Sequence, residues 1–260
     1  MNIKNTVLIT AVVLFALFAL SVPEAFCITT QVVPDRINVD SLYHGGKIDI
    51  SGVTTPGSDV IIKISSAPKA AHLRKKGKTG GLLWMNVGEL EFNPVSDVYL
   101  VYSTNEIRDI LSQQQQDTYA LGYDAFRRSV TVSPVDNDAD REKWTSEFIK
   151  MKEMNKTYAV SSGDIKIEHS TDKDSFLVHV DWPYQAPPET YTVTAYSVRD
   201  GSVEESSEGT FTVEKVGALR FLSDMAFNGA STYGIVSIII AVAAGFIVSI
   251  IFRGGKGGAH

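Results

Sequence analysis

The chain has 260 residues, of which 24 are basic and 30 acidic, giving a formal net charge of −6 and a single cysteine. A net negative chain has no general attraction for nucleic acid, so we expect no nucleic-acid partner. One cysteine cannot form an intramolecular disulfide or a thiolate cluster for a metal, so those two classes of site are not predicted.

Residues 1–27 have the layout of a secretory signal peptide. Lys4 gives a short basic region, an apolar stretch follows over 7–20, and the motif A-F-C ends the segment. We expect cleavage after Cys27. Acylation of Cys27 is the alternative, but Phe26 stands where a lipoprotein signal needs a small residue.

Residues 28–104 are predicted to form an N-terminal β-sandwich lobe. Runs such as KIDISGV, DVIIKIS and DVYLVYS are rich in β-branched and aromatic residues, and turn sequences separate them. In KIDISGV the alternation places Ile48 and Ile50 on one face and polar residues on the other. One packed face and one wet face are typical of antiparallel sandwiches.

A helical segment is predicted over 105–158. The sequence S-T-N-E forms a capping box in which Glu106 follows Ser103 by three residues. A second helix is expected to begin at Asp138 or Asp140 as its cap. Its apolar stripe is expected to consist of Trp144, Phe148, Met151 and Tyr158.

Strands resume over 159–216, the predicted C-terminal β lobe. SFLVHVDW, ETYTVTAYSV and GTFTVEKV alternate, and Asp200-Gly201 suits a hairpin turn that needs positive φ. The tyrosine in P-E-T-Y-T-V is typical of immunoglobulin-like sandwiches, here without their cysteines. Two small lobes with helices between them, or one sandwich with a helical insertion, both fit this pattern.

The C-terminal part of the chain reads as a membrane anchor. Residues 217–231 alternate apolar and polar positions as a helix lying in the membrane interface does. Residues 232–252 are long and apolar enough to be a transmembrane helix. Basic residues follow in the tail, 253–260, which predicts a cytoplasmic C-terminus and an exported domain with a net charge of −8 over 28–216.

Three stretches together carry a family resemblance. They are LRKKGKTGGLLWMNVGELEFNPVSDVYLVYST, then DWPYQAPPETYTVTAYSVRDG, then FTVEKVGALRFLSDMAF leading into the terminal helix and FRGG. This combination is similar to the bacterial transmembrane protein family Alph_Pro_TM over nearly the whole mature chain. The resemblance implies an association with a sulfite-exporter-like (TauE/SafE) permease, beside which family members often occur, and it carries over no catalytic or binding residues.

Several motifs resemble known sites. VDNDADREKWTSE places Asp136, Asp138, Asp140 and Glu147 at EF-hand spacing, but Arg141 stands where the loop needs glycine. We therefore expect a solvated loop that caps the following helix, with a calcium site as the alternative.

The remaining catalytic and metal-site patterns are weaker. Ser66 to Lys69 and Lys78 to Gly80 imitate two β-lactamase motifs, but they are too close together and the third motif is missing. The histidines are scattered, without the spacing of a metal site. His179 is expected to face solvent on its strand. We predict no catalytic residue, no cofactor and no metal ligand.

A basic stretch stands out in the otherwise acidic domain. It contains Arg74, Lys75, Lys76 and Lys78. A solvated turn is one interpretation. Contact with an anion or a partner, including lipid headgroups, is the other.

Small residues recur every four positions in the terminal helix, at Ser237, Ala241, Gly245 and Ser249. Such a face lets another helix approach closely, although small residues are also common in membrane helices generally. We therefore expect helix packing here, either with another copy of the chain or with a larger membrane protein.

The preferred function is a non-enzymatic, exported accessory protein, anchored in the inner (cytoplasmic) membrane by one span, with its large domain on the periplasmic side. Its expected partners are the lipid bilayer and a membrane protein such as a TauE/SafE-like sulfite exporter. The alternative is a membrane-tethered module that binds an anion or an envelope polymer.

Overall fold

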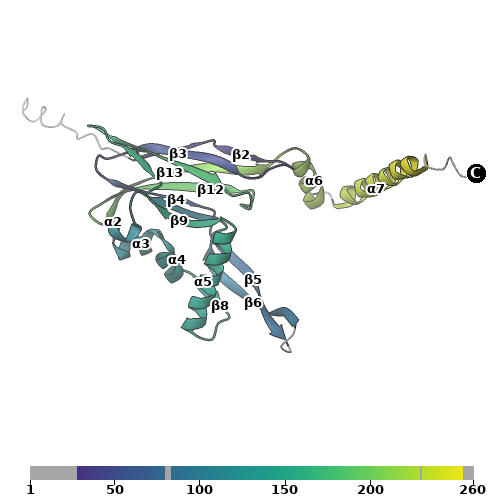
Figure 1. Cartoon of the computed structure of the whole chain (residues 1–260), viewed down its shortest axis with the longest axis horizontal. Coiled ribbons are helices and arrows are strands. Elements are labelled where there is room, and N and C mark those ends of the chain that lie inside the picture. The colour runs from purple at the N-terminus through teal and green to yellow at the C-terminus, as the bar shows by residue number, and fades with distance from the viewer. Residues whose placement is uncertain (1–27, 80–82, 229, 254–260) are drawn as a thin grey trace, which may run out of the picture.

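A computed structural model describes residues 28–79, 83–228 and 230–253. The chain is mainly β, with two large sheets, a small third sheet, a group of helices and a long C-terminal helix (Figure 1). This confirms the expected fold class. The predicted signal peptide, 1–27, and the tail beyond Arg253 lie outside the described residues.

The first sheet has the strand order β1-β3-β11-β10, with antiparallel neighbours throughout. Its strands are β1 (Thr29–Val33), β3 (Gly46–Thr54), β10 (Lys166–Glu168) and β11 (Asp174–Trp182).

The second sheet has the order β2-β13-β12-β4-β7-β9. Its outer pairs, β2 with β13 and β7 with β9, are parallel, and the pairs between them are antiparallel. Its strands are β2 (Arg36–Val39), β4 (Asp59–Ser65), β7 (Tyr99–Ser103), β9 (Tyr158–Ser162), β12 (Thr190–Arg199) and β13 (Ser202–Lys215).

The two predicted β lobes, 28–104 and 159–216, are not separate bodies. β3 pairs with β11, where Ile50 lies opposite Val178, and β4 pairs with β12, where Ile62 lies opposite Ala195. Each sheet thus needs strands from both segments. Of the two arrangements that the sequence left open, the structure has one sandwich with a helical insertion.

The main core lies between the two sheets. Inward-facing residues of β3 and β11 meet those of β4, β12 and β13 in one buried cluster. At one end of it the ring of Trp182 packs edge-on against Tyr191 and Phe211, with centroid distances of 4.5 and 4.9 Å. The alternation seen in KIDISGV and SFLVHVDW therefore supplies one face of a two-sheet core.

A second core lies on the other side of the second sheet. β4 explains why, because Ile62 and Ile64 face the main core while Ile61 faces the second one. A strand buried on both faces reads as a continuous apolar run, which is how DVIIKIS reads. The second sheet is thus the middle layer of the domain.

The insertion covers this outer face. It contains α2 (Ile107–Ile110), α3 (Gln113–Tyr119), α4 (Tyr123–Ser129), β8 (Thr131–Ser133) and α5 (Asp138–Met154). A long hairpin of β5 (Lys69–Thr79) and β6 (Leu83–Val95) pairs with β8 and forms the third sheet beside them (Figure 1). The segment 105–158, predicted to be helical, therefore also contains a strand.

The two predicted helix starts are wrong in detail. Ser103 ends β7 and donates to the carbonyl of Ser161, so it does not cap a helix. The cap of α5 is Asn137, whose side-chain oxygen accepts from the N–H of Asp140 at 2.8 Å. The prediction of Asp138 or Asp140 was wrong because Asn accepts this bond as well as Asp does, so residue preference alone does not separate these neighbouring positions.

The apolar stripe predicted for the long helix is correct in part. Phe148 is buried, and Trp144 and Met151 pack against the second core. Tyr158 belongs to that core too, but it begins β9, because α5 ends at Met154.

Local turn chemistry in the last hairpin is as predicted. Asp200 and Gly201, between β12 and β13, have φ values of +51° and +77°.

Tyr191 donates its hydroxyl to the carbonyl of Pro187 at 2.6 Å. A tyrosine that bonds to backbone a few residues upstream is compatible with an immunoglobulin-like sandwich.

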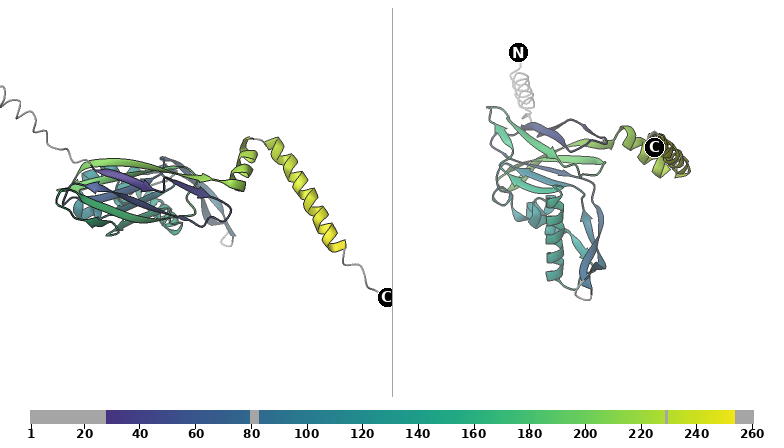
Figure 2. Two further views of the ribbon diagram at one scale, coloured as in Figure 1. Left: turned by 90° about the horizontal axis from the view of Figure 1, so that it is seen from above. Right: turned by 45° about the vertical axis from the view of Figure 1, so that its right-hand side comes forward.

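The C-terminal helices leave from one end of the sandwich. α6 (Gly217–Asn228) follows β13 directly, and α7 (Ala230–Arg253) extends away from the body (Figures 1 and 2). On α6, Arg220 and Asp224 form an exposed ion pair at 3.8 Å. Phe221 and Phe227 are also exposed.

Candidate functional site

The terminal helix has the properties of a membrane span. Tyr233–Phe252 is a stretch of 20 residues with a mean hydropathy of 3.0, and none of it is buried against the rest of the protein. At a rise of about 1.5 Å per residue it matches a hydrocarbon layer of about 30 Å. The protein is therefore a membrane protein with one candidate transmembrane helix near its C-terminus.

The predicted small-residue face lies open on this helix. Ser237, Ala241, Gly245 and Ser249 are all exposed. A Cβ built on Gly245 would meet no atom within 4 Å. Each step of four residues rotates by about 40°, so the face winds slowly around the helix, as it does in right-handed pairs of membrane helices.

The basic stretch does not form a turn, because all four of its residues lie within β5. Alternation along the strand separates them. Lys75 points toward α5, where its ammonium group lies 4.9 Å from the centre of the Trp144 ring. Arg74, Lys76 and Lys78 occupy the opposite face and are exposed. The predicted patch is therefore three residues, with Lys75 serving to pack the hairpin on the insertion.

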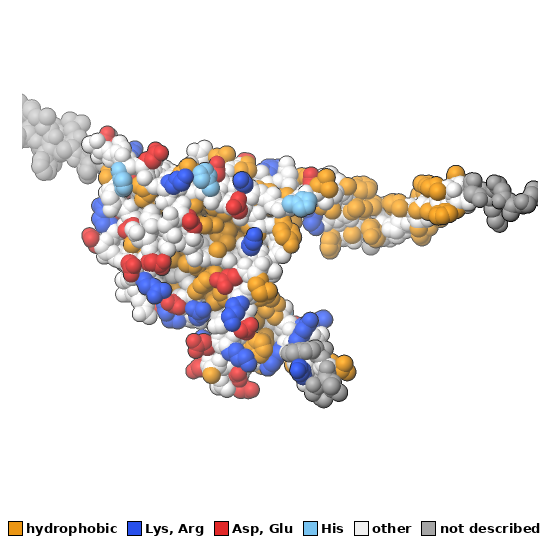
Figure 3. All heavy atoms as spheres, in the orientation of Figure 1, with side chains coloured by type: hydrophobic (Ala, Val, Ile, Leu, Met, Phe, Trp, Pro, Cys, Tyr) orange, Lys and Arg blue, Asp and Glu red, His pale blue; other side chains and the backbone are white. Residues whose placement is uncertain are grey.

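An apolar ridge on β6 accompanies the basic face, and sequence reasoning missed it as a site. Leu83, Met85 and Val87 have exposed fractions of 67, 53 and 50%. In the space-filling view, basic side chains gather on the outer part of the hairpin with hydrophobic ones at the same end (Figure 3). The alternation of residues in LLWMNV predicts a strand with one apolar face, but the same pattern occurs in strands whose apolar face is covered.

A cluster of charges joins the insertion to the sandwich. Lys152 of α5 donates to the backbone carbonyl of Asp97 at 3.1 Å. The side-chain carboxylate of Asp97 also forms an ion pair with Lys69. The ammonium group of Lys152 lies 5.4 Å from the ring centre of Tyr158. Burial lowers the pKa of Lys152, while the nearby carboxylate opposes that effect. This cluster holds α5 in place and is satisfied internally.

A buried carboxylate fixes the turn between β3 and β4. Asp174 accepts from the N–H of Gly57 at 2.9 Å and of Ser170 at 3.2 Å, and it contacts the Nδ1 atom of His169 at 2.8 Å. The bond from the Gly57 N–H is the main reason why the pKa of Asp174 lies below its usual value. The motif HSTDKD therefore has a structural role, in which Asp174 holds its own loop and the β3–β4 turn together.

Replacing Asp174 with asparagine is expected to lower the free energy of unfolding by about 2 kcal/mol at pH 7. Because the folded pKa is depressed, the stabilisation is present above the unfolded pKa, about 3.9, and is lost as the pH falls below it. Urea unfolding of the full-length protein in detergent at pH 7 and below pH 4 measures this. Asp172→Asn, an exposed change nearby, is the control. A gap between wild type and Asp174→Asn that stays constant at acid pH would contradict the linkage.

The EF-hand spacing does not give an EF-hand loop. Asp138, Asp140 and Glu147 lie in α5, and Glu147 pairs with Lys150 at 2.9 Å. Ligands spread along two turns of a helix cannot surround one ion. Among the described residues, no group of three or more His, Cys, Asp or Glu side chains is placed to hold a metal.

The serine of the apparent β-lactamase motif has a structural role. Ser66 is buried, and its hydroxyl accepts from the N–H of Asp97 at 2.8 Å. Lys78 lies near the far end of β5, away from Ser66. His179 is exposed, as predicted, and pairs with Asp49 of the neighbouring strand at 2.6 Å.

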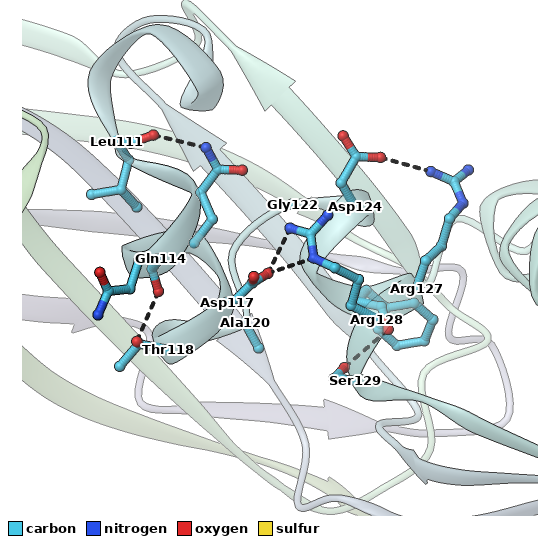
Figure 4. Close-up of polar contacts among 12 residues, drawn as sticks. Leu111, Gln114, Asp117, Thr118, Ala120, Gly122, Asp124, Arg127, Arg128 and Ser129 are labelled. Carbon is cyan, nitrogen blue, oxygen red and sulfur yellow. Dashed lines mark hydrogen bonds and ion pairs between the residues drawn. The ribbon is translucent and has the colours of Figure 1, made fainter.

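Polar groups on α3 and α4 pair among themselves. Arg128 donates to Asp117 at 2.8 Å and Arg127 to Asp124 at 3.1 Å, as Figure 4 shows. Beneath them, the buried hydroxyl of Tyr99 donates to the carbonyl of Ala120 and accepts from the N–H of Gly122. Burial raises the pKa of Tyr99, so this hydroxyl stays protonated and ties the insertion to β7.

A groove of about 660 Å³ lies where the sandwich meets the end of α5. It is lined by residues 44–47, 154–156 and 181–185. Lys47 and Lys156 contribute positive charge, Asp181 opposite Lys47 contributes one negative charge, and the exposed ring of Tyr184 lies on the wall.

Comparison with known proteins gives one result that covers the chain. Among curated proteins, and among solved structures, nothing matches it. A family model with the description "Putative transmembrane protein (Alph_Pro_TM)" matches residues 27–254. Since that match spans the whole of the sandwich, the insertion and both C-terminal helices, the chain belongs to the Alph_Pro_TM family of transmembrane proteins.

Proposed function

We propose that this protein is a non-enzymatic, exported accessory protein that docks on a membrane partner through α7. The observation that carries the proposal is the open small-residue face of that helix, centred on Gly245. A span that faced only lipid would gain nothing from such a face, because lipid packs equally well against large apolar side chains.

The partner that suits this face is another membrane helix. A TauE/SafE-like sulfite exporter permease would offer many such helices, and a second copy of this chain would offer an identical one. The four-residue spacing favours a right-handed crossing in which the two backbones approach closely. Docking on a permease would place the β domain over the outer mouth of the partner.

The proposed topology has the sandwich on the periplasmic side of the inner membrane and the C-terminus in the cytoplasm. The basic residues Arg253 and Lys256, which follow the span directly, support it. So does the predicted signal peptide over 1–27.

A non-enzymatic role is supported by the way in which the reactive groups are used. Ser66 bonds to backbone in a buried loop, and His169 and His179 each bond to an aspartate of the scaffold. None of these three arrangements joins a nucleophile to a base and an orienting group.

Replacing Gly245 with leucine is expected to reduce recovery of the partner about tenfold, equivalent to about 1.4 kcal/mol of association energy. The test is affinity recovery of tagged full-length protein from native membranes in mild detergent, followed by mass spectrometry. Ala243→Leu is the matched control, since two residues along a helix place it about 160° away from Gly245. It should leave recovery unchanged.

Three results are informative. A multi-span protein that is depleted only by Gly245→Leu identifies the partner and its contact face. A shift confined to the oligomeric state of the bait assigns the face to self-association. Recovery that is the same for wild type and both variants would show that the face is not a docking surface.

A second candidate is a membrane-tethered module that binds an anion or an envelope polymer. The groove beside Lys47, Lys156 and Tyr184 favours it, because it combines positive charge with an exposed aromatic ring. This candidate would gain support if the bait is recovered alone and if substitution of both lysines by glutamine abolishes retention on anionic cell-envelope polymers.

A further inference from the structure

Several parts of the domain meet at the end of the sandwich from which the membrane helix departs. β13 leads directly into α6, and Thr212, near its end, pairs with Thr190 of β12. Two residues further along β12, Thr192 pairs with Ser65, the last residue of β4. The β5–β6 hairpin therefore emerges from the same end of the sandwich as α6.

The outer part of that hairpin also extends on this side. In Figure 1 the described outer part of the hairpin projects below the sandwich, on the same right-hand side of the body as α6 and α7. The loop after β2 is there as well, because the carbonyl of Val39 accepts from the N–H of Val216, next to α6. That loop carries Leu42, whose side chain is 79% exposed. This end of the domain is thus the one nearest to any bilayer that α7 spans.

The apolar ridge lies on the same face of the hairpin as the residues that pack in the second core, but further out, where that face is exposed. Near the base, Leu73 and Leu90 face each other and pack in the second core. Further out, an irregularity of pairing inserts Val87, and Met85 lies opposite Gly77 on that same side. A Cβ on Gly77 would lie 2.8 Å from the Val87 side chain, so Val87 occupies the space beside the glycine. Leu83, Met85 and Val87 together form a ridge that is exposed on this side of the hairpin.

Basic side chains predominate in this outer part. Arg74 lies opposite Glu89, and beyond that pair residues 75–79 and 83–88 include three basic side chains and no acidic one, although the exported domain as a whole is acidic. Arg74 and Lys76 point away from the ridge and are exposed. An element with apolar side chains on one face and basic ones on the other is the combination found where proteins lie on anionic membranes.

We infer that the outer β5–β6 hairpin is a second membrane contact, in which Leu83, Met85 and Val87 enter the boundary between headgroups and acyl chains while Arg74 and Lys76 bind anionic headgroups. The span α7 keeps the hairpin close to the bilayer, so that even a weak contact is populated through high effective concentration. Together with the exposed rings of α6, the hairpin would hold the sandwich in one orientation over the membrane. This inference is independent of docking through Gly245.

The test uses the full-length protein reconstituted into vesicles of phosphatidylethanolamine and phosphatidylglycerol. Met85→Cys, in a Cys27→Ser background, carries an environment-sensitive fluorophore, and lipids with a nitroxide at a shallow acyl position act as quenchers. Ser202→Cys, at the opposite end of the sandwich, carries the control label. We expect a blue-shifted, quenched signal at position 85 and a water-like, unquenched one at position 202.

The role of charge is tested by Arg74→Gln with Lys76→Gln. Each basic residue near an anionic surface contributes about fivefold to binding, so the double change is expected to reduce contact about thirtyfold. Arg108→Gln with Lys166→Gln removes the same charge from exposed positions outside the hairpin and should have no effect. Equal quenching in anionic and in purely zwitterionic vesicles would overturn the assignment of Arg74 and Lys76.

A label at position 85 that stays water-exposed in vesicles of lipid alone would overturn the membrane contact itself. If such a label became protected only after native membrane proteins were added, the ridge would belong to a protein interface instead. Both results leave the Gly245→Leu experiment unaffected, so failure of one proposal is distinguishable from failure of the other.

Discussion

Substituting alanine for Gly52 is expected to destabilise the domain by about 3 kcal/mol or more. Gly52 lies in the middle of β3, between β1 and β11, and pairs with Thr30 and Phe176. A Cβ at this position would lie 1.8 Å from the carbonyl oxygen of Thr29 and 2.5 Å from the ring of Phe176. Because one obstacle is backbone, β1 would have to move away from the sheet.

Thermal and urea unfolding of the full-length protein in detergent measure this loss. Gly88→Ala in β6 is the control, since a Cβ there would meet no atom within 4 Å. It is expected to change stability by less than about 0.5 kcal/mol. Similar unfolding midpoints for the two variants would mean that β1 is not held against β3 as described.

Truncating Phe148 to alanine is expected to lower the free energy of unfolding by about 3 to 5 kcal/mol. The ring stacks on Phe92 of the hairpin, with centroids 4.7 Å apart, and meets Tyr158 of β9 edge-on at 5.8 Å. One side chain of α5 thus joins the third sheet to the second. Its removal leaves a cavity at the centre of the second core.

The same unfolding measurements test this prediction. Met154→Ala, at the exposed end of the same helix, should cost less than about 0.5 kcal/mol. If Phe148→Ala cost no more than this control, the insertion would not be packed on the sandwich through this ring.

The candidate sites show which features a single sequence can predict. The small-residue face of α7 was predictable, because helix periodicity alone determines which residues share a side. The basic patch was predictable in composition only. Its division into Lys75 on one face and Arg74, Lys76 and Lys78 on the other depends on the strand and on the position of Trp144.

The EF-hand spacing and the apolar ridge could be interpreted only with the tertiary structure. Arg141 disfavoured an EF-hand loop but left a calcium site as the alternative, and only the structure shows that Asp138 and Glu147 belong to one helix. The ridge of Leu83, Met85 and Val87 was hidden, because alternation predicts a strand face without revealing whether anything covers it.

The sequence by itself determined the mainly β class, the turn at Asp200-Gly201 and the apolar C-terminal helix, because each depends on hydrophobicity or backbone preference within a short window. Tertiary structure alone decided that the strands before and after the insertion form one sandwich. The pairing of Ile50 with Val178 joins residues far apart in the chain, and many registers would satisfy local alternation equally well. It also decided that β4 is buried on both faces, because that burial requires two other layers to pack against one strand.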